Sequence, residues 1–251
     1  MDRKDLKSLY EDREKVEEYW DRTGAHTLTP EELEVLKKKL LYEHTWAITV
    51  DMFIKMAMLR SGMRVLDAGC GWGRTIIGLK KYIPDLKVTG IDITPRLINL
   101  AERIVAEETD KKDTLLRVGD VQNLEFSDSF FDAVLSTRVL QYVSNPQKAI
   151  NEFARVLKIG GRVIVMVPNK LNPVVFVKYH TKSYSPFELK MWFENANLKI
   201  VGFGSIGYIP TIYRSKNYTE LVYIDRVIRT IPILKYYGGL AMCIGEKTVK
   251  D

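Results

Sequence analysis

The stretch Met63-Arg-Val-Leu-Asp-Ala-Gly-Cys-Gly-Trp-Gly73 decides how the rest of the chain is interpreted. Its apolar run ends at Asp67, and glycines then stand at the alternate positions Gly69, Gly71 and Gly73 before a helical pattern begins. Glycine lets backbone N–H groups approach a ligand without a Cβ in the way, and it tolerates a positive φ. Because the first N–H groups of a helix are unpaired, this order of strand, tight turn and helix predicts the floor of a nucleotide-type cofactor pocket.

The spacing of the glycines distinguishes two kinds of cofactor. In the dinucleotide fingerprint G-x-G-x-x-G the third glycine comes three positions after the second. Counted from Gly71 that position is Arg74, whereas the third glycine already stands at Gly73. The pattern Asp67-x-Gly69-x-Gly71-x-Gly73 is instead similar to motif I of the class I methyltransferases that depend on S-adenosylmethionine (SAM). An NAD-dependent oxidoreductase stays open as an alternative, which a comparison of SAM binding with NAD binding would decide.

The composition is that of an ordinary globular chain. Its 251 residues, 46% hydrophobic and 28% charged, suit one α/β domain with additions. The net charge is +6, from 38 basic and 32 acidic residues that are dispersed, which does not favour a nucleic-acid partner. No stretch approaches the about 18 apolar residues of a membrane span, and the charged N-terminus does not resemble a secretory signal. Cys70 and Cys243 lack metal-type spacing and suggest a reducing compartment, so we expect a cytoplasmic protein without a metal site.

Helical signals dominate the first sixty residues. The segment 29–32 offers Thr at an N-cap, Pro after it and Glu three residues after the cap, which predicts a helix start. The mostly apolar segment 41–59 predicts a further helix that continues to about residue 61. We therefore expect residues 1–60 to form a helical cap and residues 61–251 to form the cofactor-binding domain.

Strand and helix patterns alternate after this cap. Apolar runs predict strands at 65–68, 86–91, 115–118, 133–136, 162–167, 199–203 and 240–246. Helical patterns lie at 74–82, 96–108, 145–157 and 186–195. A capping box at Ser185 and Glu188 opens the last of these helices, and Gly160-Gly161 is interpreted as a turn before the fifth strand. The alternation predicts a doubly wound, Rossmann-like α/β sheet with helices on both faces.

Residues 206–238 do not fit the alternation. The stretch holds six tyrosines and five basic residues against two acidic ones, and it is too long for a simple turn. We predict a partly helical, lid-like insertion that forms, with the N-terminal helices, an aromatic and basic-rimmed mouth for an apolar or anionic acceptor. The alternative is plain packing of an enlarged domain, because tyrosines often lie at half-buried edges.

Acidic residues follow the ends of three predicted strands, at Asp67, Asp92 and Asp120. In a doubly wound sheet, ligands bind at the carboxyl ends of the strands, where the strand order reverses. Asp92 lies 25 positions after Asp67, close to the about 20-residue offset of a carboxylate that binds ribose hydroxyls. Asp120 is placed to accept a hydrogen bond from an exocyclic amine. One such aspartate is typical of a turn, but three at neighbouring strand ends predict an adenosyl site.

With these residues the chain resembles the class I SAM-dependent methyltransferases, most closely the small-molecule group of ubiquinone/menaquinone-type, methyltransferase type 11-like enzymes. The segments that carry the resemblance are 65–73, 90–92, 119–120, 131–136 and 155–162. The resemblance implies a seven-stranded sheet with an antiparallel last strand, and methyl transfer from SAM to a small-molecule acceptor. The cofactor-binding residues that it implies are Asp67, Ala68, Gly69, Gly71, Gly73, Asp92, Ile93, Asp120, Val121, Thr137 and Arg138.

The resemblance also implies a division of roles within the site. The glycine loop would hold the methionine part of SAM with Asp67 near it, and Asp92 would bind the ribose. Asp120, with the backbone of Val121, would bind the adenine. Thr137 and Arg138, just past the fourth strand, would line the methyl group's exit.

Methyl transfer depends on alignment and water exclusion more than on covalent help, and a base is required only where the acceptor must lose a proton. His180 is the candidate base, and Tyr42, His44 and Tyr184 are candidate substrate contacts, although ordinary structural roles suit each of them. The Asn/Asp-Pro-Pro-Tyr motif of amino-methylating enzymes is absent after the fourth strand. An RNA or protein methyltransferase and a non-catalytic SAM-binding protein are the alternatives. The sequence does not predict the oligomeric state.

Overall fold

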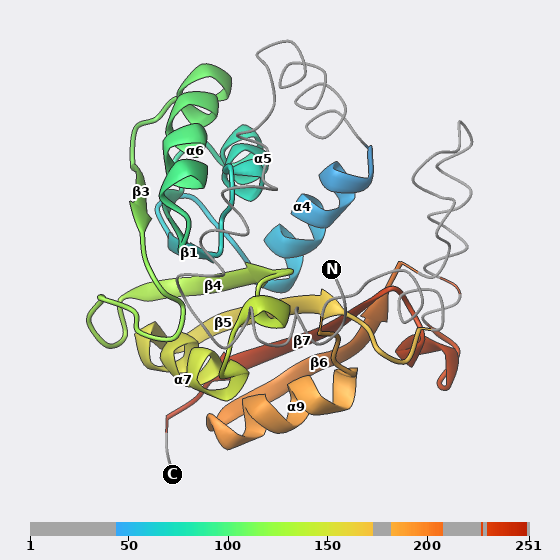
Figure 1. Cartoon of the computed structure of the whole chain (residues 1–251). Coiled ribbons are helices and arrows are strands. Elements are labelled where there is room, and N and C mark those ends of the chain that lie inside the picture. The colour runs from blue at the N-terminus through green and yellow to red at the C-terminus, as the bar shows by residue number, and fades with distance from the viewer. Residues whose placement is uncertain (1–43, 173–181, 208–226, 228–229, 250–251) are drawn as a thin grey trace.

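The computed structural model describes residues 44–172, 182–207, 227 and 230–249, with side chains from residue 49 onward (Figure 1). Its helices are α4 (His44–Met56), α5 (Arg74–Tyr82), α6 (Pro95–Glu108), α7 (Pro146–Val156) and α9 (Pro186–Asn195), with short 3-10 helices η2 (Leu140–Tyr142) and η4 (Leu234–Tyr236). Its strands are β1 (Arg64–Ala68), β2 (Lys87–Asp92), β3 (Thr114–Val118), β4 (Phe131–Thr137), β5 (Leu157–Pro168), β6 (Leu198–Ile206) and β7 (Leu240–Lys247). The predicted N-terminal helix start at residue 29 lies outside the described residues.

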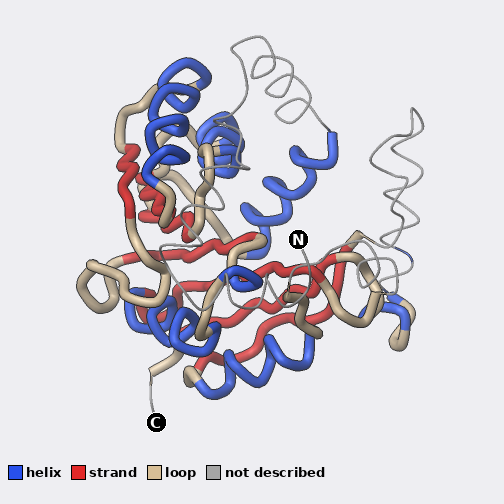
Figure 2. Tube along the Cα trace, viewed as in Figure 1, coloured by secondary structure: helices blue, strands red, loops and turns tan. Residues whose placement is uncertain are grey.

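The seven strands form one sheet in the order β3-β2-β1-β4-β5-β7-β6, which confirms the predicted Rossmann-like class (Figure 2). Strands β1 to β5 pair in parallel, whereas β7 is antiparallel to both β5 and β6, as the resemblance implied. The order reverses between β1 and β4, because the chain runs outward from β1 to β3 and then returns to β4 on the other side of β1. Because ligands bind where the strand order reverses in such sheets, we expect the ligand crevice at the carboxyl ends of β1 and β4.

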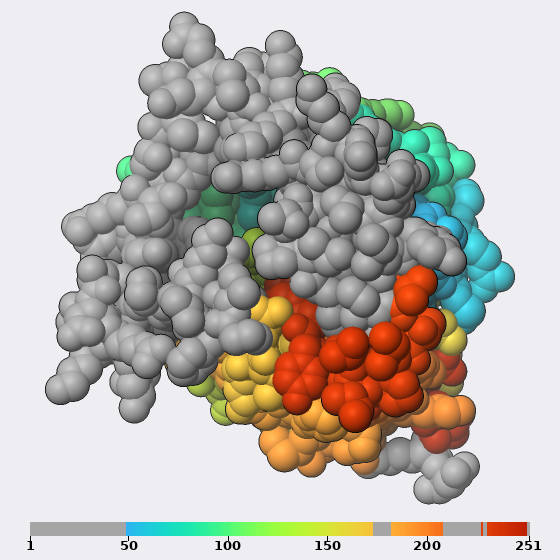
Figure 3. All heavy atoms as spheres, turned by 90° about the vertical axis from the view of Figure 1, so that its right-hand side faces the viewer, coloured from blue at the N-terminus to red at the C-terminus, as the bar shows by residue number. Residues whose placement is uncertain are grey.

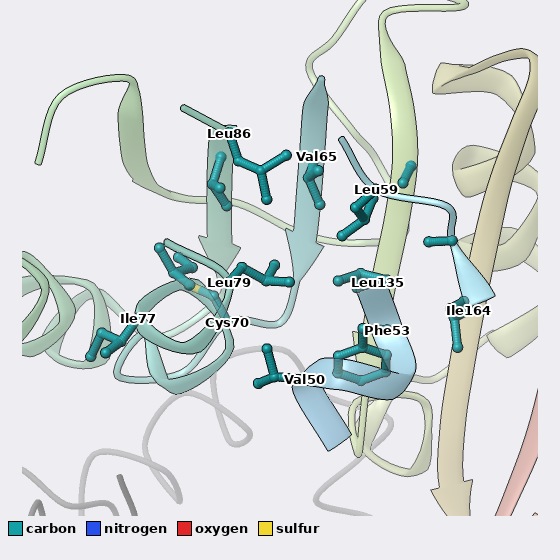
Figure 4. Packing of buried hydrophobic residues seen from close by; sticks show 14 of the residues in the cluster. Val50, Phe53, Leu59, Val65, Cys70, Ile77, Leu79, Leu86, Leu135 and Ile164 are labelled. Carbon is teal, nitrogen blue, oxygen red and sulfur yellow. The ribbon is translucent and has the colours of Figure 1, made fainter. Parts of the chain in front are cut away.

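The core has two parts, one on each face of the sheet. Successive side chains in a strand point to opposite faces, so Val65 of β1 packs with α4, α5 and α6, while Leu66 packs with α7 and α9. Figure 4 shows Val50 and Phe53 of α4 beside Leu135 of β4 in the first of these cores. Burial on both faces explains why the central strands are almost continuously apolar rather than alternating.

Two element boundaries differ from the prediction. Helix α4 ends at Met56, not near residue 61, because Met58 takes a left-handed conformation with φ of 51° and the Leu59 N–H donates back to the Ile54 carbonyl at 2.8 Å. Strand β5 already begins at Leu157, so the two glycines lie inside the strand and do not form a turn before it. The glycines lie in an irregularity of the β4–β5 pairing, because Phe131 pairs with Leu157 and Ala133 already pairs with Arg162. Gly160 has φ of 76°, and a Cβ on Gly161 would approach the Asp132 carbonyl oxygen to 2.7 Å, so both positions favour glycine.

The predicted capping box of α9 is confirmed. The Ser185 hydroxyl accepts from the Glu188 N–H at 3.2 Å, and the Glu188 carboxylate accepts from the Ser185 N–H at 2.7 Å. Thr94 is the N-cap of α6, but its side chain makes no capping hydrogen bond. Of the proposed insertion at 206–238, the structure describes only the end of β6, Val227, and the segment 230–239 that contains η4.

Candidate functional site

The three aspartates predicted for the site lie along one edge of the sheet, at the carboxyl ends of β1, β2 and β3. They are staggered rather than aligned, because Asp67 pairs with Gly90, two residues before Asp92, and Asp92 pairs with Val118, two residues before Asp120. Each step therefore advances the carboxylate by about 7 Å along the strand direction. The three carboxylates are therefore spread along the strand direction and do not form a single acidic cluster.

The glycine loop that follows β1 is a bare turn with three positive φ angles, 84° at Gly69, 53° at Gly71 and 89° at Gly73. The N–H groups of Gly69 and Cys70 both donate to the Ile91 carbonyl at 2.8 Å, which fastens the loop to β2. A Cβ on Gly69 would collide with Val139, 2.1 Å away, whereas a Cβ on Gly71 would meet no atom within 4 Å. Packing therefore requires glycine at position 69. The space beside Gly71 is open, and we call this space the glycine cradle.

Asp92 joins the glycine loop to β2. One carboxylate oxygen accepts from the Gly71 N–H at 3.0 Å, and the other accepts from the Thr94 N–H at 3.0 Å. Burial raises the pKa of Asp92 above its ordinary value, and these N–H donors oppose that rise. Each oxygen keeps a further lone pair, so the carboxylate can still accept hydrogen bonds from a ligand.

Asp67 is the most perturbed carboxyl group of the site. Burial, followed by the negative charge of Asp92, raises the pKa of Asp67 to about 7, although a hydrogen bond from Thr75 lowers it in part. Its Oδ2 atom is buried without a hydrogen-bond partner among the described residues. An uncompensated buried carboxylate is costly unless a cation or a donor reaches it. The position therefore fits a positively charged ligand group.

Asp120 is less clearly available to a ligand. Its Oδ1 atom accepts from the Gln122 N–H at 2.8 Å, which is the hydrogen bond of an ordinary turn. Val121 is buried in the core under α7, which fixes the backbone of the turn at the end of β3. The predicted contact between Asp120 and an exocyclic amine stays a prediction.

The segment after β4 closes the crevice from the other side. The Ser136 hydroxyl donates to the Ala68 carbonyl at 3.0 Å, and Val139 packs on Gly69, so this segment lies against the glycine loop. Thr137 is half-buried at the strand end, and Arg138 is exposed with φ of 60°. A left-handed arginine at this point turns the chain abruptly into η2.

Gln141 in η2 is a residue that the sequence reasoning missed. Its side chain is fully buried, and neither its Oε1 nor its Nε2 atom has a hydrogen-bond partner among the described residues. A buried amide without partners costs free energy that a polar ligand can recover. The only signal in the sequence is one amide inside the run Val139-Leu-Gln-Tyr-Val143.

Of the weaker candidates, the structure describes the side chain of Tyr184 alone, so the others stay predictions. Tyr42 and His180 lie outside the described residues, and His44 begins α4 with an undescribed side chain. Tyr184 follows the end of β5 in a bridge to Asn169, and its ring packs on Trp192 at 4.9 Å. Burial, followed by the nearby charge of Glu188, raises the pKa of Tyr184 to about 12, so its phenol stays protonated and is a poor base.

Among the residues that the structure describes, no group of three or more His, Cys, Asp or Glu side chains could hold a metal ion. No helix among these residues is long and apolar enough to span a membrane.

Comparison with known proteins gives a consistent family. The family model described as a methyltransferase domain matches residues 59–222. A demethylmenaquinone methyltransferase of Symbiobacterium thermophilum is 33% identical over 119 residues, 47% of this chain and 47% of that protein. A ubiquinone biosynthesis O-methyltransferase of Dechloromonas aromatica is 29% identical over 198 residues, 71% of this chain and 84% of that protein. The chain thus spans about half of the first relative's length and most of the second's.

The solved structures show the same fold at lower identity. A geranyl diphosphate C-methyltransferase from Streptomyces coelicolor A3(2), solved with Mg2+, geranyl diphosphate and S-adenosyl-L-homocysteine, superposes with a TM-score of 0.65 at 16% identity. The superposition covers 94% of this chain and 98% of that one. At this identity the likeness shows the fold alone.

Proposed function

The chain belongs to the methyltransferase-domain family, and from this premise we propose that it transfers a methyl group from SAM to an apolar, quinone-like or lipid-like small molecule. One observation carries the proposal. The space beside Gly71 is open, and the Asp92 carboxylate next to it accepts a hydrogen bond from the Gly71 N–H. The two features together suit a ligand that is both a nucleoside and a cation.

The residues of the crevice fit SAM by their chemistry. Asp92 would accept hydrogen bonds from ribose hydroxyls through its remaining lone pairs, and Ile93 would lie beside it. The unpartnered Oδ2 of Asp67 would face the cationic amino acid end, next to the open cradle at Gly71. Asp120 and the Val121 backbone would bind the adenine. SAM, when bound, supplies a methyl group on a positively charged sulfur that is already a good leaving group.

The chain's own contribution to catalysis is alignment in a dry site. Ser136 and Val139 hold the segment after β4 against the glycine loop, which fixes the two walls of the crevice relative to each other. A fixed geometry lowers the entropic part of the barrier, and exclusion of water protects the transfer. Thr137 and Arg138 would line the exit of the methyl group. Gln141, whose amide nitrogen and oxygen both lack a hydrogen-bond partner among the described residues, would orient a polar oxygen of the acceptor.

The acceptor class is drawn from the relatives. Two of them are named for demethylmenaquinone and ubiquinone biosynthesis. Both names point to a quinone, which supports an apolar acceptor. The predicted helical cap at residues 1–60 and the predicted lid-like insertion at 206–238, most of which lie outside the described residues, stay predictions for the acceptor side of the pocket.

The test has two parts. Calorimetry with SAM and with NAD should give binding of SAM only, and binding of NAD alone would refute the cofactor. A screen of lipid extracts with methyl-labelled SAM should then place label on an isoprenoid quinone or a related lipid. Label on RNA or protein instead would refute the acceptor class while leaving the cofactor assignment in place.

A further inference from the structure

A cluster of exposed apolar side chains lies where β6, α9 and the segment before β7 meet. We call it the edge patch and define it by Phe187, Met191, Ile231, Ile233, Leu234 and Tyr237, all of which are exposed. Ile233 is 71% exposed, although isoleucine is among the residues most often buried in proteins. Figure 3 shows the segment 230–239 in orange-red at the surface, next to the orange of β6 and α9. Such a concentration of apolar side chains usually marks an interaction site.

The backbone beneath the edge patch is held in place by buried polar side chains. The Asn169 amide donates to the carbonyls of Tyr236 and Gly238 at 2.8 and 2.7 Å, and Asn172 donates to that of Tyr237 at 2.8 Å. The Ser205 hydroxyl donates to the Lys235 carbonyl at 2.8 Å and accepts from the Gly238 N–H. Because these polar groups of the segment are satisfied inward, the aliphatic side chains are presented outward by a fixed backbone.

The charges around the edge patch are positive or neutralised. Among the described residues from Val227 to Gly245 there is one basic residue, Lys235, and no acidic one. Lys235 lies over the rings of Tyr236 and Phe203, at 4.9 and 5.7 Å from their centroids. The two carboxylates of α9 are paired with lysines, Glu188 with Lys170 and Glu194 with Lys190. Aliphatic and tyrosine side chains beside lysine, without opposing acid, match the interface of an anionic bilayer.

The topology places the edge patch on the same edge of the sheet as the cofactor crevice. Strands β5 and β6 both pair antiparallel with β7, so β6 runs parallel to β5 and its last residue, Ile206, lies at the carboxyl edge. Pro168 of β5 and Ile206 of β6 both pair with Leu240, the first residue of β7. The segment 230–239 therefore leaves the sheet at the edge where β1 and β2 present Asp67 and Asp92.

We propose that the edge patch docks the enzyme on the surface of an anionic phospholipid membrane, with the aliphatic side chains in the headgroup boundary and Lys235 at the phosphates. The orientation would turn the carboxyl edge toward the bilayer, from which an apolar acceptor could enter. Only this last consequence rests on the proposed function. A second copy of the chain is the competing occupant, and the oligomeric state in solution distinguishes it from a membrane.

The experiment uses the full chain and vesicle co-sedimentation. Phosphatidylcholine vesicles with phosphatidylglycerol should bind the protein, pure phosphatidylcholine should bind it weakly, and added salt should reduce the bound fraction. The double variant Ile233→Asp with Leu234→Asp should lower the apparent affinity about tenfold or more, and Lys235→Gln should lower it less. The matched control is Ile159→Asp, because Ile159 is 60% exposed but lies near the start of β5, away from the carboxyl edge.

Three results would overturn the proposal. They are an absence of binding to the anionic vesicles, an equal loss in the Ile159→Asp control, and unchanged binding by the double variant. A patch that instead holds two copies together would show in sedimentation velocity as a dimer that the double variant dissociates, without any effect on vesicles. Calorimetry with SAM on the same variants separates the two proposals, because intact SAM binding without vesicle binding refutes only the membrane contact.

Discussion

Replacement of Asp92 by alanine tests the cofactor site most directly. The carboxylate already accepts the N–H groups of Gly71 and Thr94, so about two of its four lone-pair sites remain for ribose hydroxyls. Hydrogen bonds to a charged group contribute about 1.5–3 kcal/mol each, and water recovers part of this in the variant. A net loss of about 1–3 kcal/mol is expected, which is a rise of about 5- to 150-fold in the Kd for SAM.

The same substitution has a structural cost that must be separated from binding. Alanine leaves the Gly71 and Thr94 N–H groups without their acceptor, which costs stability, but it also removes a partly buried charge that repels Asp67. We therefore expect a net destabilisation of about 1–2 kcal/mol, small enough for the chain to stay folded. Asp92→Asn keeps the shape and one acceptor, and should weaken SAM binding less than alanine does.

The assay is isothermal calorimetry with SAM, accompanied by thermal unfolding of each variant. Asp110→Ala is the matched control, since Asp110 accepts the Lys112 N–H at 2.9 Å in the same kind of turn but in an exposed loop far from the crevice. The control should bind SAM normally. A folded Asp92→Ala variant that binds SAM within twofold of the parent would refute the ribose role and the reasoning that places it at the end of β2.

Four further outcomes are expected from the site. Gly71→Val should abolish SAM binding. The matched control is Gly62→Val, because Gly62 also has a positive φ and open space beside it but lies outside the site. The control should lose comparable stability and still bind SAM. The pKa of Asp67 is raised from 3.8 to about 7 in the folded chain, so its contribution to the free energy of unfolding is present below pH 3.8 and is lost as the pH rises toward 7. Asp67→Asn should flatten this pH dependence in denaturant titrations. A flat pH profile in the parent chain would contradict the raised pKa. A cationic ligand at Asp67 should lower this pKa again, so SAM binding near pH 6.5 should release a proton, measurable by calorimetry in buffers of different ionisation enthalpy. Gln141→Leu should leave SAM affinity unchanged and reduce kcat/KM for the acceptor about tenfold or more, with equal loss of SAM affinity counting against an acceptor contact.

Local signals in the sequence predicted most element boundaries well. The capping box at Ser185 and the Pro-led starts of α6 and α7 all lie where short-range hydrogen bonds and fixed φ angles favour a helix start. The end of α4 was wrong because nothing in the apolar run marks the left-handed turn at Met58, which brings Leu59 into the core. The predicted start of β5 was wrong because the glycine pair was interpreted as a turn before the strand, whereas it lies in an irregularity of the β4–β5 pairing inside β5.

The sequence by itself determined the fold class and the positions of Asp67, Asp92 and the glycine loop, because period, spacing and strand ends are local properties. Only the tertiary structure decided their electrostatics. The unpartnered Oδ2 of Asp67, the buried amide of Gln141 and the exposed side chains before β7 all depend on neighbours far away in the chain. Burial and desolvation are set by everything packed around a group, so no short stretch of sequence can reveal them.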